Sequence, residues 1–382
     1  MDRDPDFLAE CQSLARVVEP FRTFSALRAS VQWPELESRL SRVLSQVRRF
    51  TPQHPAPPTE QADRVKAAHW NIEHGNRYES IERALRDQED LRDADVIFLN
   101  EVDLGMARAG NRDVAGDLAR ALGRHGLWAP LFLETTRGRD DDADLAAGRP
   151  NQESLFGLAL LSRWPFGEVR LIELPSPETY QFEVERMLGR HIGLVARVER
   201  PGAPFVAVAS HLEVHRTRAD RATQVRTLLQ TLDSDSLPVL FAGDFNSHTF
   251  DRGRAWDAAF GAGVLMFAPD RELEHRLLFP DHGPTREPLF DELKRNGFEW
   301  DRLVDRVPTL QLRFDRIDEL RAFPDFVQRG VRGALAWAER RGRLRLDWFA
   351  ARGFGGGHGH TVQGLDGRGG ASDHAPIICE LW

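Results

Sequence analysis

From residue 65 onward, the sequence alternates short apolar runs with helical patterns, and this alternation limits the chain to an α/β fold. Residues 65–70 and 94–99 predict strands, and residues 79–88 predict a helix between them. Several later strand candidates follow one another without a helix between them, so part of the sheet should be antiparallel. These later candidates, which accompany one further helix at 221–232, are 158–161, 192–198, 205–209, 239–242 and 377–381.

The N-terminal part of the chain has a different pattern. Apolar residues recur at intervals of three and four between residues 36 and 47, so residues 1–50 are predicted to be a helical extension that packs on the main domain. A partner-docking helix is the alternative. Prolines at positions 52, 55, 57 and 58 cannot continue a helix, which predicts a proline-rich linker at 51–63.

The main domain is expected to span residues 64–382, with an insertion at about 249–343 where the alternation is interrupted by a charged and aromatic stretch. Six arginines between positions 329 and 345 could meet an anionic substrate or form a solvated helix face. Residues 353–370 are rich in glycine and are expected to form a mobile loop.

Charge and cysteine content exclude some classes of protein. A net charge of -8 argues against a surface that grips nucleic acid everywhere by counterion release, although a local basic cleft stays open. Cys11 and Cys379 are too far apart in sequence to indicate a disulfide framework. Neither a secretory signal nor an apolar stretch of roughly 20 residues is found, so a cytoplasmic protein without a transmembrane segment is expected. The oligomeric state is unknown from the sequence.

Polar residues stand at the ends of the predicted strands, where loops can converge on one rim of the domain. Carboxylates and carboxamides dominate, and no cysteine or histidine cluster has zinc spacing. Such oxygen ligands suit magnesium, which keeps several waters for a phosphate to replace. Taken alone, an Asn or Asp after a strand is typical of a turn or cap, a Glu is typically solvated and a single His is typically structural, but the set is much more specific. The set is Asn71, Glu73, Glu101, His211, Asp244, Asn246, Asp373 and His374.

In this order, the motifs make the chain resemble the endonuclease/exonuclease/phosphatase superfamily, which has a DNase-like fold. The resemblance covers about residues 64–382 and implies a four-layer α/β sandwich of two facing mixed β-sheets flanked by helices. The matching motifs are Trp70-Asn71-Ile72-Glu73, Leu99-Asn100-Glu101-Val102, Ser210-His211-Leu212, Gly243-Asp244-Phe245-Asn246, Arg345-Leu346-Asp347-Trp348 and Ser372-Asp373-His374.

The resemblance also implies a metal site. Glu101 would be the principal ligand of Mg²⁺, for which Mn²⁺ could substitute, and Asn71 and Asp373 would assist it. Such an ion neutralises phosphoryl charge and stabilises the leaving oxygen. Glu73 stands near a position that is often Asp in the family, which leaves open whether it reaches the metal directly.

Catalytic roles follow from the same resemblance. Asp244 would orient or deprotonate the attacking water. Asn246 would hydrogen-bond a phosphate oxygen, and Asn71 would also contact the substrate. His211 would bind the substrate and donate to the developing oxyanion. The last pair, in which Asp347 fixes the tautomer of His374, would contact the phosphate or assist proton transfer.

The expected function is therefore magnesium-dependent hydrolysis of a phosphate ester by in-line attack of water. The favoured substrate is a phosphodiester, the favoured activity is nuclease-like, and nucleic acid is a possible partner. The alternatives are a lipid or small-molecule phosphodiesterase or phosphatase of the same fold, and a catalytically inactive binding module. Leu155 and Phe156 replace a Tyr of some nuclease branches, and no hydrophobic membrane-inserting hairpin is evident. His215, Arg216 and His248 lie close to motif residues and could shape specificity.

Overall fold

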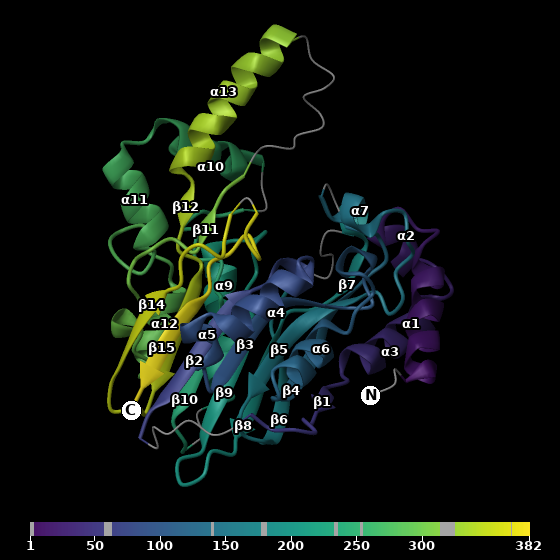
Figure 1. The fold of residues 1–382 in the computed structure, drawn as a ribbon. Coiled ribbons are helices and arrows are strands. Elements are labelled where there is room, and N and C mark those ends of the chain that lie inside the picture. Colours follow the sequence, from purple (N-terminus) through teal and green to yellow (C-terminus); the bar gives the residue numbers. More distant parts are fainter. Residues whose placement is uncertain are drawn as a thin grey trace.

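Two mixed β-sheets pack face to face and carry helices on their outer faces, which confirms the predicted α/β sandwich (Figure 1). The computed structural model describes residues 4–56, 63–138, 141–176, 182–232, 236–252, 255–313, 325–367 and 369–382.

The first sheet holds both ends of the main domain side by side. β2 and β3 are parallel, and the other neighbours in this sheet pair antiparallel. β15 lies between β2 and the edge strand β14, so the C-terminal strand pairs with the first strand of the domain. In spatial order the strands are β1 (Arg48–Phe50), β4 (His125–Glu134), β5 (Leu155–Ser162), β3 (Val96–Leu104), β2 (Val65–Asn71), β15 (Ile377–Leu381) and β14 (Gly357–Thr361), with β7 (Met187–Gly189) also paired to β4.

The second sheet has five strands. Only β9 and β10 are parallel, because helix α9 connects them, and the remaining pairs are antiparallel. Its order is β13 (Asp347–Arg352), β10 (Val239–Asp244), β9 (Phe205–His211), β8 (Ile192–Val198) and β6 (Phe166–Glu173). A two-stranded sheet lies apart from it and consists of β11 (Leu310–Gln311) and β12 (Arg343–Leu344).

Successive side chains of a strand point to opposite faces of its sheet, so each sheet has one face in the core between the sheets and one face under the helices. In β2, Val65 and Ala67 point into the core between the two sheets, whereas Ala68 and Trp70 point to the outer face of the first sheet. Since both faces are covered, the strand is mostly apolar and does not alternate between polar and apolar residues, although Lys66 and His69 interrupt it before Asn71. This is why continuous apolar runs in the sequence predicted strands correctly.

Helices cover the outer face of each sheet and shield it from water. Thr217 and Asp220 form a capping box that starts α9, because each side chain accepts a hydrogen bond from the backbone of the other. Helices α9 (Arg218–Gln230) and α12 (Leu289–Arg295) cover the second sheet. The first sheet is covered by α1 (Pro5–Val18), α2 (Phe24–Arg28), α3 (Trp33–Leu44), α4 (Tyr78–Asp87), α5 (Glu89–Arg92) and α6 (Val114–Ala121).

The N-terminal helices share the hydrophobic core of the main domain. Leu36 and Leu40 of the predicted apolar stripe are buried with Trp128 of β4, and Arg39 joins α3 to Glu10 of α1 at 2.7 Å. Residues 48–50 are not helical as predicted but form β1, because they pair with the edge of β4. The linker and the domain boundaries stay predictions, and residues 57–62 lie outside the described residues.

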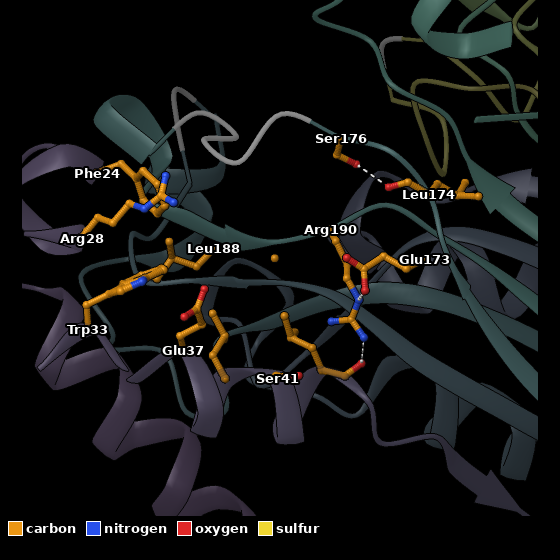
Figure 2. Close-up of a pocket in the computed structure, with 13 residues that line it drawn as sticks. Phe24, Arg28, Trp33, Glu37, Ser41, Glu173, Leu174, Ser176, Leu188 and Arg190 are labelled. Atoms are coloured by element: carbon orange, nitrogen blue, oxygen red, sulfur yellow. Dashed lines mark hydrogen bonds and ion pairs between the residues drawn. The ribbon is translucent and has the colours of Figure 1, made fainter. Parts of the chain in front are cut away.

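A cavity of about 290 Å³ lies where α2 and α3 meet the end of β7 (Figure 2). Phe24 and Trp33 line it on the helix side, and Arg190 lies on the other side in an ion pair with Glu173 at 3.1 Å. This cavity is remote from the predicted site residues, none of which lines it.

Residues 255–344 contribute helices that project beyond the ends of the sheets (Figure 1). A separate apolar cluster of Leu273, Leu277, Leu344 and Leu346 holds them to the body. The helices are α10 (Ala255–Phe267), α11 (Asp270–Leu278) and α13 (Asp325–Arg341); shorter elements elsewhere are α7 (Asp141–Ala146), α8 (Phe182–Glu185), η1 (Glu73–Gly75), η2 (Ala107–Ala109) and η3 (Asp301–Leu303).

The glycine-rich segment is not the loop that the sequence predicted, because its residues 357–361 form the edge strand β14. A Cβ on Gly359 would lie 2.3 Å from the carbonyl oxygen of Leu303, so glycine is required by close packing. Among the described residues, no helix has the length and apolar content needed to cross a membrane.

Candidate active site

The predicted site residues converge where strands of both sheets end. In the second sheet, Asp244 is in cross-strand register with His211 on one side and Asp347 on the other. In the first sheet, Asn71 pairs with Asn100, and Glu101 follows directly. The two groups meet across the gap between the sheets, where the Asn71 Nδ2 atom lies 3.3 Å from the Asp244 Oδ2 atom.

Glu101, the predicted principal metal ligand, projects from an irregularity in β3. The register of β3 against β5 shifts between Leu99 and Val102, and Glu101 has a positive φ of 55°. This left-handed conformation is costly for a residue with a Cβ, and such outliers concentrate at functional sites. The bulge turns the carboxylate toward Asn71, whose Nδ2 atom donates to Glu101 Oε1 at 2.9 Å.

The orientation of Asn71 bears on its predicted role as a ligand. Its Oδ1 atom accepts a hydrogen bond from the Glu73 backbone N–H at 3.2 Å, and its amide nitrogen faces the carboxylates of Glu101 and Asp244. In this arrangement, Asn71 orients the two carboxylates as a donor. Its role as a metal or substrate ligand stays a prediction.

A group of acidic side chains surrounds Glu101. Burial and the nearby charge of Asp373 raise the pKa of Glu73 to about 7. Burial likewise raises the pKa of Asp373, and the charge of Glu101 adds to this effect although His374 opposes it. The three carboxylates therefore repel one another. Carboxylate oxygens are the ligand type that a hard divalent cation such as Mg²⁺ prefers.

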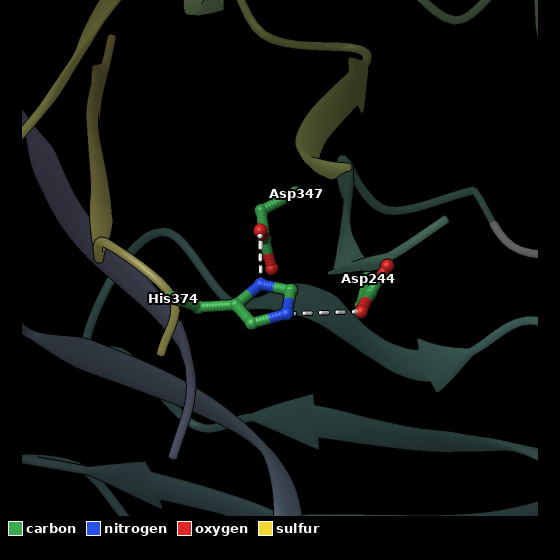
Figure 3. A group of neighbouring side chains, drawn as sticks. All are labelled: Asp244, Asp347 and His374. Atoms are coloured by element: carbon green, nitrogen blue, oxygen red, sulfur yellow. Dashed lines mark hydrogen bonds and ion pairs between the residues drawn. The ribbon is translucent and has the colours of Figure 1, made fainter. Parts of the chain in front are cut away.

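Asp244 lies between two imidazoles, and Figure 3 shows its contact with His374. Its Oδ2 atom is 3.6 Å from His211 Nε2 and 3.8 Å from His374 Nε2. Burial and the charge of Asp347 raise the pKa of Asp244, which makes the carboxylate a stronger base. The Asn246 backbone N–H fixes the other oxygen of this carboxylate at 2.9 Å.

The predicted pair of Asp347 and His374 is in contact. His374 Nδ1 lies 2.7 Å from Asp347 Oδ2 (Figure 3), and the other carboxylate oxygen lies 2.9 Å from His69 Nε2. Although burial opposes charge on both groups, Asp347 raises the pKa of His374 well above its ordinary value. The charge and hydrogen bond of His374 in turn hold the pKa of Asp347 well below its usual range. His374 is therefore a buried cation whose Nε2 atom faces Asp244.

No role was predicted for His69, although it lies in the apolar run before Asn71. Its ring is fully buried and anchors the second oxygen of Asp347. The run Ala-Ala-His-Trp offered a signal, since a histidine in a fully buried strand must find a polar partner.

A network around His74 was also missed by the sequence reasoning. His74 Nε2 lies 3.6 Å from Glu101, and its Nδ1 atom lies 3.7 Å from Asp103. Burial and the charge of Arg108 work against protonation, but the carboxylates of Asp142, Glu101 and Asp103 raise the pKa of His74 to about 10. His74 also has a positive φ of 65°. Its position directly after the Asn-Ile-Glu motif was the only available signal.

Arg108 is the buried cation at the centre of this network. It is fully buried and lies 2.8 Å from both Asp103 and Glu134, with Asp142 at 3.4 Å. Three carboxylates thus share one guanidinium, and burial raises the pKa of Glu134 to about 7 even against the charge of Arg108. These ion pairs restrain the residues beside Glu101.

The site opens into a cavity of about 250 Å³. Glu101, Asp244, Asn246, His211 and His374 lie along one part of its wall. Apolar side chains line another part, namely Phe132, Phe156, Met187, Val214, Leu310 and Leu346. The cavity therefore offers acid, base and cationic groups beside an apolar surface.

The residues flanking the motifs behave differently from one another. Asn246 donates its Nδ2 to the Leu212 carbonyl at 2.8 Å and has a positive φ of 48°, so it braces the loop that carries Asp244. His215 is exposed and lines the cavity. His248 is buried against Arg221, and burial together with that charge lowers its pKa well below the ordinary value. Arg216 does not line the cavity.

The arginine-rich stretch is only partly available to a substrate. Arg345 is fully buried and pairs with Asp305 at 2.9 Å. Arg341 pairs with Asp270 at 3.0 Å, while Arg340 and Arg343 are exposed. The side chains at positions 329 and 332 lie outside the described residues.

Comparison with known proteins identifies the family. A sequence model of the Endonuclease/Exonuclease/phosphatase family matches residues 68–374, which include every predicted site residue. The chain belongs to this family. The endonuclease/exonuclease/phosphatase match runs from the middle of β2 to His374, and it confirms the resemblance predicted from the motifs.

Solved structures of the endonuclease/exonuclease/phosphatase family are similar to this chain at low identity. An endonuclease/exonuclease/phosphatase from Beutenbergia cavernae has 19% identity and a TM-score of 0.48, with 84% of this chain and 71% of that one covered. The human Nocturnin catalytic domain with bound sulfate anion has 15% identity and a TM-score of 0.43, covering 84% and 94%. A mannosyl-6-phosphatase from Bacteroides thetaiotaomicron has 14% identity and a TM-score of 0.45, covering 83% and 99%. A search among curated proteins found no match.

Proposed function

We propose that the protein is a magnesium-dependent hydrolase that cleaves a phosphodiester by in-line attack of water. The observation that carries this proposal is the position of Asp244, a buried carboxylate of raised pKa that lies within 4 Å of two imidazole nitrogens and faces the cavity. Glu101 lines the same cavity. A base, two cationic or polar donors and a cation site thus surround one small space.

Glu101, Asp373 and Glu73 would hold the Mg²⁺, and Asn71 orients Glu101 for that purpose. The ion, when bound, supplies positive charge beside the phosphoryl oxygens and the leaving oxygen. Burial and, to a lesser extent, repulsion between the carboxylates raise the pKa of Glu73 and of Asp373, which supports this assignment because a cation would stabilise their charged forms.

Asp244 orients the attacking water and accepts its proton as the new O–P bond forms. The P–O bond to the leaving group breaks on the opposite side, and the leaving oxygen takes up a proton and departs as an alcohol. Its raised pKa brings it closer to the range in which a carboxylate is an effective general base. Negative charge gathers on the phosphoryl oxygens in the transition state, and the N–H groups of His211 and His374 face the place where it gathers. Asp347 accepts the hydrogen bond from Nδ1–H of His374 and favours the imidazolium, whose second N–H, on Nε2, faces Asp244.

The charged groups of the cavity favour a compact phosphodiester over a polynucleotide. His74 beside Glu101 and Arg108 in the cavity wall are both held by carboxylates. Arg345 and Arg341, on which a nuclease reading relied, are paired with Asp305 and Asp270. A nucleic-acid backbone needs several free cations along its path. Nuclease activity is the second candidate, supported by the family to which the chain belongs.

A binding module without catalysis is disfavoured by the same geometry. An inactive relative would have no reason to keep the 2.7 Å contact between Asp347 and His374 or the strained backbone at Glu101.

Hydrolysis of bis(p-nitrophenyl) phosphate tests the proposal, with Mg²⁺ and then with excess chelator. We expect turnover that needs the metal, much slower turnover of the monoester p-nitrophenyl phosphate, and a loss of about 10²-fold or more in Asp244→Asn. Asp281→Asn is the matched control, because Asp281 is an equally buried carboxylate outside the cavity. Turnover that survives chelation would disprove the metal dependence, and faster cleavage of single-stranded DNA or RNA would favour the nuclease candidate.

A further inference from the structure

Helix α10 is apolar on every side. Its 13 residues, Ala255–Phe267, contain one charged residue, Asp257. A surface helix normally carries a polar face, and a helix that is hydrophobic all round is normally buried in protein or lipid. α10 therefore needs a partner on each of its faces.

One face of α10 has its partner within the protein. Val264 and Leu265 pack against the apolar cluster that includes Leu273, Leu344 and Leu346. The other face carries three aromatic side chains that are exposed to solvent: Trp256 at 84%, Phe260 at 60% and Phe267 at 84%.

The spacing of these aromatic residues places them together. Positions 256, 260 and 267 differ by four and eleven residues, which corresponds to nearly whole turns of 3.6 residues. The three rings therefore line one stripe along the helix, and Trp337 of α13, which is 43% exposed, lies at the end of this stripe. We call these four residues the aromatic patch.

Hydrogen bonds from α13 fix the end of the helix that presents the patch. The Arg341 guanidinium donates to the carbonyl oxygens of Leu265 at 2.9 Å, Met266 at 2.8 Å and Ala268. Trp337 Nε1 donates to the Met266 carbonyl at 3.3 Å. These contacts satisfy carbonyl groups that a helix C-terminus leaves without partners. The aromatic patch is thus held in place by the fold.

The helix that carries the patch shares an apolar cluster with the candidate active site. α10 follows the loop that carries Asp244 and Asn246, and it projects with α11 and α13 beyond the sheet ends (Figure 1). Leu346 joins the cluster beneath α10 and also lines the active-site cavity, and Leu310 contacts both as well. α10 is therefore connected through this apolar cluster to the wall of the active-site cavity.

We infer that the aromatic patch docks on an anionic lipid surface and that the substrate is a phosphodiester in the headgroup of a lipid of that surface. This inference rests on the proposed function for its substrate. Trp and Phe favour the interfacial region of a bilayer. A helix of 13 residues is about 20 Å long, which is too short to span the bilayer, so it lies in the interface with its aromatic face in the lipid.

The charged residues beside the aromatic patch favour an anionic lipid surface as its partner. The chain as a whole carries a net charge of -8, yet exposed arginines flank the patch. Arg340 lies over the Trp337 ring at 5.6 Å, and Arg343 is exposed on β12 just beyond α13. Basic residues next to an apolar helix face are typical of helices that bind anionic membrane surfaces.

Two other occupants fit less well. Single-stranded nucleic acid stacks on aromatic rings, but it also needs cations all along its backbone, whereas α10 contains none and Arg340 and Arg343 belong to the α13 and β12 side of the patch. A second copy of the chain would cover the patch with its own, but the flanking Arg340 and Arg343 would then be brought close to like charges. Both occupants are outcomes of the experiment below.

Vesicle binding of the full chain, measured in excess chelator to prevent turnover, tests the inference. We expect the protein to sediment with vesicles of phosphatidylcholine and phosphatidylglycerol, more weakly with phosphatidylcholine alone, and more weakly at high salt. The combined change Trp256→Ser, Phe260→Ser and Phe267→Ser should lower the partition coefficient by about a hundredfold or more, because each ring loses its burial in lipid.

The matched control changes exposed apolar residues elsewhere, Val31→Ser with Trp382→Ser, and should leave vesicle binding unaltered. With Mg²⁺, the aromatic triple variant should cleave the soluble bis(p-nitrophenyl) phosphate at the wild-type rate but lose activity on phospholipid vesicles. These measurements separate the proposed function from the proposed docking. If the wild-type protein cleaves neither substrate, the proposed function is wrong. Vesicle binding does not require cleavage, so it tests the docking by itself.

Three results would overturn the inference. The first is an absence of vesicle binding by the wild-type protein on either lipid composition. The second is patch-dependent binding of a single-stranded oligonucleotide without vesicle binding. The third is a dimer, seen by light scattering, that the triple variant converts to a monomer.

Discussion

Replacing Asp347 by asparagine tests the pair that positions His374. The carboxylate is fully buried and accepts two hydrogen bonds, from His374 at 2.7 Å and from His69 at 2.9 Å. An amide of the same size keeps one oxygen acceptor but presents an NH₂ group to the other ring. One of the two histidines must then change its tautomer or turn away.

The magnitude follows from these contacts. A hydrogen bond to a charged group contributes about 1.5–3 kcal/mol, and breaking a buried ion pair costs about 3–5 kcal/mol. The introduced amide keeps one acceptor and removes the repulsion between Asp347 and Asp244, so we expect a loss of about 2–3 kcal/mol in the free energy of unfolding. The rate should fall more, by about 10²- to 10⁴-fold in kcat, because His374 loses both its orientation and the charge that stabilises its imidazolium.

Urea unfolding and steady-state kinetics on a chromogenic diester measure the two effects. Asp281→Asn again provides the control, since Asp281 is buried and accepts hydrogen bonds from Arg306 and Trp300 outside the cavity. The control should lose comparable stability and keep its kcat. Mg²⁺ affinity should change little in Asp347→Asn, because neither partner of Asp347 is a proposed ligand.

The double change of Asp347→Asn with His374→Ala decides whether the two residues act as a unit. If they do, the double variant should be hardly slower than His374→Ala alone, since groups that act together are not additive. Losses that multiply would refute the reasoning and return Asp347 to a purely structural role.

Glu101→Gln should weaken Mg²⁺ binding more than any other single change in the site, because it removes the central carboxylate; titration calorimetry with unaltered affinity would contradict the assignment. Leu14→Ala should lower the free energy of unfolding by roughly 2–5 kcal/mol while kcat stays the same, since this fully buried side chain belongs to the core that the N-terminal helices share with the first sheet. Urea curves at two wavelengths would check it. Burial alone would raise the pKa of Asp281, but the Arg306 guanidinium holds it below the usual range. Because the pKa of Asp281 is lower in the folded protein than its value of about 3.9 in the unfolded chain, the ionised carboxylate adds stability above about pH 4. This stability is lost as the pH falls through the folded pKa. Asp281→Asn should therefore flatten the decline of the unfolding free energy below about pH 4.

Long apolar runs made much of the sheet predictable. The strands at 192–198 and 377–381 have the predicted bounds, because most residues on both faces of each strand are buried and apolar, with Arg197 and Glu380 as exceptions. Pro130 interrupts β4, where the register against β5 also shifts, so the longest strand had a weak signal. β14 was hidden for a different reason: it is made of glycine and histidine, which have low strand propensity.

The site was predictable as a set of strand-end residues but not as a geometry. Motif order indicated that Asp244 and His374 belong together, whereas the contact of Asp347 with His69 depends on how the two sheets face each other. The positive φ of Glu101 comes from a register shift against β5, which no local pattern encodes. His74 could not be found because its partners, Asp103 and Asp142, come from separate segments.

The exposure of the aromatic patch could not be predicted from the sequence. An apolar run of this length in α10 predicts a core helix as readily as a surface one, because sequence does not say which faces have partners. Only the packing of Val264 and Leu265 beneath the helix reveals that Trp256 and Phe260 have none among the described residues.

Strain and distant contacts together explain why this site depends on the whole fold. Glu73, His74, Glu101 and Asn246 all have positive φ, and each such residue costs on the order of 1–3 kcal/mol. The contacts that hold them in place join distant segments: Ser372 Oγ donates to the Asn71 carbonyl at 2.7 Å, across 301 positions. β15 next to it pairs with β2, so the first and last strands of the domain form one element. Opening of that pair would release Asp373, His374 and Asn71 at once, and the strained backbone would relax. The geometry of this site therefore requires the completed first sheet, and packing in the hydrophobic cores offsets the strain in its backbone.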